Sequence, residues 1–90
     1  MGNSEIIKWT KSDAMFFFDR WIIPMIADEF KIDETKALRD FILSETYKML
    51  ADDETKLLRE SPLFIFDLFK AERETGDPRN SNYIRTIHND

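Results

Sequence analysis

Residues 14–27 read AMFFFDRWIIPMIA and are the most apolar stretch of the chain. Their hydrophobic side chains recur at helical spacing, so that one face carries Ala14, Phe18, Trp21, Ile22, Met25 and Ile26. Oxygens that can cap the first turn stand just before the stretch, on Thr10, Ser12 and Asp13. The pattern predicts a helix over residues 12–30, which Pro24 kinks or divides because it removes one backbone hydrogen bond.

This helix has more large apolar residues than one face can hold. Arg20 and Asp28 lie toward the side opposite the first stripe, and four further side chains also lie outside it: Phe16, Phe17, Ile23 and Phe30. A helix that is apolar over more than one face is central in its protein or contributes to an interface. We therefore predict that these four residues form a face for a protein partner or for a second copy of the chain. The alternative is that both faces pack within one monomer, helped by an N-terminal arm that carries Trp9.

Two similar octads follow, DETKALRD at residues 33–40 and DETKLLRE at residues 53–60. A duplicated unit is disfavoured, because the sequences after the two octads do not match in register. Asp33 is a good N-cap, so the first octad predicts the start of a helix over residues 34–50. Apolar residues mark one side of that helix: Leu38, Phe41, Ile42, Met49 and Leu50. The second octad precedes Pro62, which disfavours helix at the residue before it, so we predict a turn and a short extended or single-turn segment there.

A last helix is predicted over residues 62–75. Ser61 is its N-cap, Pro62 occupies the first helical position, and Gly76 suits the left-handed residue that ends many helices. The sequence therefore predicts an all-α fold with one compact three-helix domain in residues 1–75, the first residues being a polar leader. Residues 76–90 are predicted to be a mobile or docking tail.

Composition and charge limit the function classes. The 90 residues include 13 basic and 18 acidic ones, for a net charge of −5, and show no basic stripe of the kind that binds nucleic acid. The longest apolar stretch is broken by Asp19 and Arg20 and is too short to span a bilayer. We expect a cytoplasmic protein that does not bind nucleic acid directly or insert into membranes.

Chemically active motifs are not recognisable in the sequence. The single His88 stands close to the C-terminus, both glycines are isolated, and no Ser or Thr has an evident activating base. The acidic run at residues 52–54 differs from a calcium loop, since Lys56 follows it and the required glycine is missing. We predict no catalytic, cofactor-binding or metal-binding residues, and no enzymatic activity.

The segment FILSETYKMLADDETKLLRESPLFIFDLFKAE, residues 41–72, resembles a pattern in small uncharacterised bacterial helical proteins. In these proteins a helix ends in Ser-x-Thr-Tyr, an acidic turn follows, and Glu-Ser-Pro opens a last amphipathic helix. The resemblance implies a binding or regulatory role of the kind found near mobile elements or in toxin–antitoxin-like gene pairs. We predict a small acidic protein–protein interaction module, with a homodimer as one form. The alternatives are an acidic decoy for a nucleic-acid-binding or basic protein surface and, less favoured, a metal-binding protein or enzyme.

Overall fold

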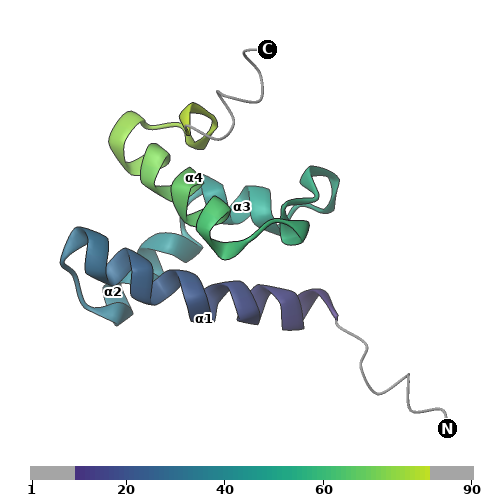
Figure 1. Cartoon of the computed structure of the whole chain (residues 1–90), viewed down its shortest axis with the longest axis horizontal. Coiled ribbons are helices and arrows are strands. Elements are labelled where there is room, and N and C mark those ends of the chain that lie inside the picture. The colour runs from purple at the N-terminus through teal and green to yellow at the C-terminus, as the bar shows by residue number, and fades with distance from the viewer. Residues whose placement is uncertain (1–9, 82–90) are drawn as a thin grey trace, which may run out of the picture.

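The computed structural model describes residues 10–81, and Figure 1 shows how its helices are arranged. Within these residues the chain forms four α-helices: α1 (Lys11–Phe30), α2 (Glu34–Ile42), α3 (Glu45–Ala51) and α4 (Pro62–Thr75). Three short 3₁₀ turns accompany them: η2 (Asp53–Thr55), η3 (Leu57–Arg59) and η4 (Pro78–Asn80). Every regular element between residues 10 and 81 is helical, which confirms the predicted all-α class. The predicted leader with its Trp9 arm, and His88, lie outside the described residues.

The predicted helix over residues 34–50 is two helices, so the expectation of three helices is wrong. Ser44 separates them with an extended backbone, φ −84° and ψ 161°. Its hydroxyl accepts a hydrogen bond from the Tyr47 N–H at 3.0 Å and donates one to the Phe41 carbonyl at 2.6 Å. A serine that satisfies both neighbouring helix ends in this way competes with a continuous helix.

The two similar octads adopt different backbones, as predicted. In the first, Asp33 caps α2 by accepting a hydrogen bond from the Lys36 N–H at 2.8 Å. In the second, η2 and η3 meet at Lys56, whose φ of 57° is left-handed and therefore strained for a residue other than glycine. Pro62 restricts the backbone only at Ser61, just after the second octad. Within the octad, the Thr55 hydroxyl contacts the Met49 carbonyl at 2.6 Å and the Asp52 carbonyl at 2.8 Å, at the turn that follows α3.

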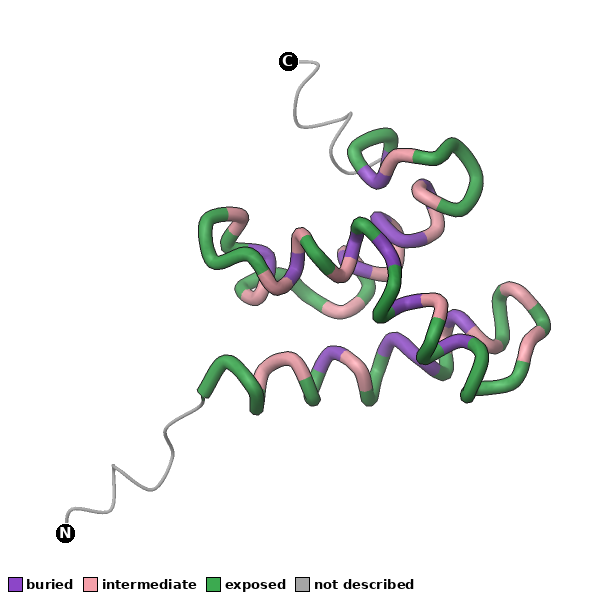
Figure 2. Tube along the Cα trace, turned by 180° about the vertical axis from the view of Figure 1, so that it is seen from behind, coloured by how far each residue is buried: buried purple, intermediate pink, exposed green. Residues whose placement is uncertain are grey.

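The core lies between α1 on one side and α4 with α3 on the other, as Figures 1 and 2 show. Aromatic rings meet edge to face at its centre, with 5.8 Å between the centroids of Phe41 and Phe69 and 6.0 Å between those of Phe30 and Phe69. The remaining large side chains that are fully buried are aliphatic: Ile22, Ile26, Leu50, Ile65 and Leu68. Of the apolar side predicted for residues 34–50, Phe41 and Leu50 reach this core, whereas Leu38 and Ile42 are exposed.

A carboxylate joins α4 to the start of α3. Glu72 accepts hydrogen bonds from the Glu45 N–H at 2.9 Å, the Thr46 N–H at 2.9 Å and the Thr46 hydroxyl at 2.8 Å. Because the N-terminal N–H groups of a helix have no partner within it, Glu72 supplies acceptors where α3 needs them.

The residues after α4 turn back along it. Gly76, with a φ of 89°, ends the helix in the left-handed conformation. Pro78 and Ser81 are buried, and η4 packs against α4. Residues 76–81 of the predicted tail therefore lie on the helical domain, and the rest of the tail lies outside the described residues.

Candidate protein-binding surface

The structure separates the four residues predicted to form a partner face. Phe16 and Phe17 are exposed, by 65% and 39% of their surface, whereas Ile23 is buried. Phe30 is half-buried, and its ring packs on Phe69 inside the domain. The four residues do not form one continuous exposed face.

Trp21 is exposed, although the sequence pattern places it on the buried face of α1. The pattern assigns it to the core stripe with Ile22 and Ile26, yet 56% of its surface is exposed, and Ile23 occupies the core instead. Successive residues of a helix point about 100° apart, so α1 can present Phe17 and Trp21 to one side and its isoleucines to the other. Only the packing of α2 and α4 on the isoleucine side decides which face is covered.

Two aromatic rings therefore lie as a strip along the side of α1 on which no other helix of residues 10–81 packs. The rings of Phe17 and Trp21 lie one turn apart, with 6.5 Å between their centroids. Pro24 continues the strip, and the helix passes through it undivided from Lys11 to Phe30. Because proline has no N–H, the Arg20 carbonyl lacks its usual helical donor at this point.

Two opposite charges flank Pro24 on the same side of α1. Arg20 stands four residues before it and Asp28 four residues after it, and both are exposed. Neither forms an ion pair with any residue between 10 and 81. Together with Trp21, Pro24 and Met25 they line a shallow hollow of about 520 Å³. We call Phe17, Arg20, Trp21, Pro24 and Asp28 the outer face of α1.

Two grooves lie beside this face, and Phe16 and Asp19 line both of them. The groove between α1 and α2, about 410 Å³, also contains Leu38, and the groove between α1 and α3, about 420 Å³, also contains Tyr47. The Oδ1 atom of Asp19 is shielded from solvent and has no hydrogen-bond partner within the described part of the chain.

This position changes the acidity of two groups. Burial raises the pKa of Asp19 above its ordinary value of 3.8. Burial also raises the pKa of Tyr47, and the nearby negative charge of Asp19 raises it further. Partial burial therefore disfavours the charged form of Asp19 relative to its protonated form.

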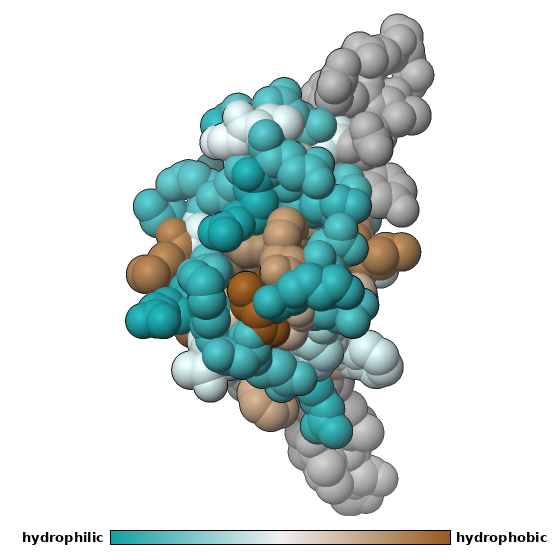
Figure 3. Space-filling model, turned by 90° about the vertical axis from the view of Figure 1, so that its left-hand side faces the viewer, coloured by the Kyte–Doolittle hydropathy of each residue, from teal (hydrophilic) through white to brown (hydrophobic). Residues whose placement is uncertain are grey.

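Other exposed apolar residues lie at separate places on the molecule. Figure 3 views the end where α1 turns into α2, and apolar side chains emerge there as patches framed by hydrophilic ones. Leu43, at the corner between α2 and α3, is 72% exposed, and Leu63 on α4 is 55% exposed.

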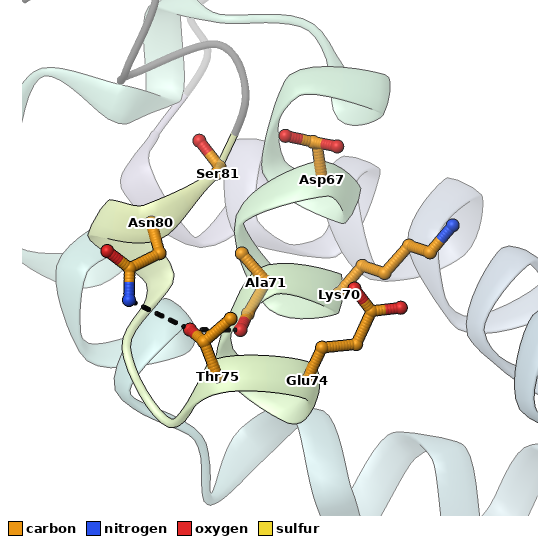
Figure 4. Close-up of a pocket in the computed structure, with 7 residues that line it drawn as sticks. All are labelled: Asp67, Lys70, Ala71, Glu74, Thr75, Asn80 and Ser81. Carbon is orange, nitrogen blue, oxygen red and sulfur yellow. Dashed lines mark hydrogen bonds between the residues drawn. The ribbon is translucent and has the colours of Figure 1, made fainter.

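A small polar hollow of about 160 Å³ lies between α4 and η4 (Figure 4). The Thr75 hydroxyl donates to the Ala71 carbonyl at 2.8 Å and accepts from the Asn80 amide at 3.0 Å. Asp67 faces the hollow, and its Oδ2 has no hydrogen-bond partner among residues 10–81.

The acidic turn after α3 has structural partners. Asp52 caps η2 by accepting from the Glu54 N–H at 3.0 Å, and Asp53 pairs with Lys11 at 3.1 Å. Between residues 10 and 81, no three His, Cys, Asp or Glu side chains gather in a way that could hold a metal ion. None of the helices in that range is both long and apolar enough to cross a membrane.

No protein-family model, curated protein or solved structure matches the chain. The resemblance of residues 41–72 to small bacterial helical proteins therefore stays a prediction.

Four members of the outer face were not predicted as parts of a partner surface: Arg20, Trp21, Pro24 and Asp28. A signal for them exists in the spacing of Phe17, Trp21 and Pro24 at i, i+4 and i+7, which describes one side of a helix. The stripe that contains the isoleucines has the same helical spacing, so periodicity alone does not indicate which of the two sides of α1 is buried.

Proposed function

We propose that this protein is a protein–protein interaction module that binds through the outer face of α1. The observation that carries the proposal is the exposure of Trp21 and Phe17 on adjacent turns, in a domain that buries Phe18, Phe41 and Phe69. Exposed tryptophan and phenylalanine are enriched at the centres of protein interfaces, where they contribute most of the binding free energy.

The surroundings of the two rings support the same function. Arg20 and Asp28 border the aromatic strip, which matches the usual arrangement of an apolar centre with a polar rim. A charged rim selects partners by complementarity and adds little affinity by itself. The proposal places the module in the cytoplasm, as the sequence predicts.

The decoy function has less support among the described residues. A decoy needs carboxylates gathered on one face, and several acidic side chains are instead paired with bases, as in Lys70–Glu29 at 3.4 Å and Lys36–Asp40 at 3.2 Å. We therefore keep protein–protein interaction as the proposed function.

Site-specific photo-crosslinking tests it. Benzoylphenylalanine would replace Phe17 in one variant and Leu63 in a matched control, since both positions are exposed and apolar and lie on different helices. After irradiation of cells that naturally contain the protein, position 17 should give a covalent adduct of higher mass and position 63 should not.

The absence of any adduct from position 17 would contradict the proposal, and so would either of two other outcomes. One is the same adduct pattern from both positions. The other is a crosslink from position 17 that leaves the mass unchanged, because the face would then be covered by the chain itself.

A further inference from the structure

We infer that the partner on the outer face of α1 is a second copy of this chain, bound as an antiparallel α1–α1 pair centred on Pro24. The inference rests on the proposed function, because it names the occupant of the same surface. Its evidence is the charge pattern of the face, which is complementary to itself.

The geometry of two antiparallel helices sets which residues meet. When the two-fold axis passes at Pro24, a residue four places before it lies opposite a residue four places after it in the other copy. Arg20 of each copy then faces Asp28 of the other, so one interface contains two identical ion pairs. A parallel arrangement would instead place Arg20 against Arg20 and Asp28 against Asp28, which is repulsive.

The distances required are ordinary for packed helices. Arg20 and Asp28 are each about 6 Å along the axis from Pro24, at about 1.5 Å per residue. Helix axes in contact lie about 8–10 Å apart, a gap that arginine and aspartate side chains can bridge. Neither charge is already used within residues 10–81, so both are available to a second copy.

The apolar part of the face fits the same arrangement. Trp21 of each copy would lie near Pro24 and Met25 of the other, which line the shallow hollow on α1. This burial would cover the largest exposed aromatic ring at the centre and leave the ion pairs at the rim. Since two single helices make a small interface, we expect a dissociation constant on the order of 10 µM.

Charge reversal provides a direct test. In the variant Arg20→Glu, the introduced glutamate would face Asp28 of the other copy, and in Asp28→Arg the introduced arginine would face Arg20 of the other copy. Sedimentation equilibrium should show that the wild type self-associates and that each reversal weakens self-association by roughly tenfold or more, because two attractive pairs become repulsive.

Mixing the two variants is the decisive step. A heterodimer of Arg20→Glu with Asp28→Arg has opposite charges at both of its contacts. In it, the introduced glutamate of one chain faces the introduced arginine of the other, and the native Asp28 of the first faces the native Arg20 of the second. The mixture should therefore associate more tightly than either variant alone.

The double variant Arg20→Glu/Asp28→Arg should likewise recover self-association, because both of its contacts pair a glutamate with an arginine. Added salt should weaken the mixed pair, since its charges are near solvent.

Matched controls separate this geometry from a general effect of charge. Arg39→Glu and Glu54→Arg make similar charge changes at exposed positions away from the outer face, and they should leave self-association unchanged. Trp21→Ser should abolish it, whereas Leu63→Ser, at a similarly exposed apolar position, should not. Thermal unfolding of each variant checks that the domain remains folded.

A wild type that stays monomeric up to about 1 mM would overturn the homodimer. Mixed variants that fail to associate would overturn the antiparallel pairing. Either result leaves the proposed function separately testable, because an adduct from position 17 with a different protein would still support it, whereas the absence of any adduct would contradict it.

Discussion

Asp19 is a single residue whose charged form destabilises the folded domain. Its carboxylate lies between two apolar grooves, and Oδ1 has no hydrogen-bond partner among residues 10–81. Burial without a partner disfavours the charged form, which is why the pKa of Asp19 is raised. The free energy of unfolding is therefore lower when Asp19 is ionised than when it is protonated.

The variant Asp19→Asn should be more stable than the wild type at neutral pH. An acid with a raised pKa in the folded state contributes stability at low pH and loses it as the pH rises through that raised value. The gain should therefore disappear below 3.8, the ordinary pKa of the side chain, where the wild-type carboxyl is protonated in both states. Because the side chain is only partly shielded, we expect less than about 1 kcal/mol.

Urea unfolding across this pH range measures the effect. Glu54→Gln removes a charge from an exposed turn residue and serves as the control, with no comparable gain expected. A loss of stability in Asp19→Asn at neutral pH would show instead that the carboxylate has a stabilising partner.

At the scale of elements, α3 depends on a residue from another helix. It has seven residues, Glu45–Ala51, and isolated helices of that length are not stable in water. Ser44 caps it locally, but Glu72 of α4 accepts three further hydrogen bonds from its first turn. The position of α3 is therefore fixed by its contact with α4.

The variant Glu72→Gln should destabilise the domain by about 2 kcal/mol. The amide keeps one acceptor oxygen but loses the negative charge that strengthens bonds to a helix N-terminus. Glu74→Gln, two residues further along α4 and exposed, is the matched control and should change stability little. The midpoint of urea unfolding reports the difference.

Hydrogen exchange locates the same effect. In Glu72→Gln the amide of Thr46, which donates to Glu72, should exchange faster than in the control. Equal unfolding midpoints and equal exchange in the two variants would show that the cap contributes nothing measurable.

At the scale of the whole molecule, the other helices of residues 10–81 pack on one side of α1 and leave the opposite side exposed. The isoleucines of α1 pack toward α2 and α4, and the opposite side presents Phe17 and Trp21. A domain this small buries a limited share of its apolar surface, so a second copy would cover what the helices of one monomer leave exposed.

The thermal midpoint should rise with protein concentration if the second copy binds as proposed. A partner that binds only the folded state raises the free energy of unfolding, and the increase grows with the ratio of protein concentration to the dissociation constant. Each kcal/mol gained shifts the midpoint by roughly 4–8 °C in a domain of this size. Scanning calorimetry of wild type and Arg20→Glu, at concentrations below and well above about 10 µM, measures the effect.

The midpoint of Arg20→Glu should stay constant over the same range, because its rim charges repel a second copy. If the wild-type midpoint is equally constant, self-association does not stabilise the fold and the homodimer proposal is contradicted.

Local signals in the sequence were sufficient for most element boundaries. Asp33 and Ser61 cap the helices that the sequence predicts them to cap, and Gly76 ends α4. The sequence also predicted that the two octads differ in backbone, although Pro62 restricts only Ser61 and the turn inside the second octad lies at Lys56. Ser44 was the exception, since a serine can stand inside a helix or cap one, and its hydrogen bonds to Tyr47 and Phe41 decide between the two.

The sequence by itself determined that the chain forms capped helices with a strongly apolar first helix, because caps, proline and periodicity act over a few residues. Only the tertiary structure decided which side of α1 is buried, placing Ile23 in the core and Trp21 outside. The two sides of α1 are similarly apolar, so local spacing cannot rank them. The choice depends on which side α2 and α4 cover, and that is a property of contacts between residues far apart in the chain.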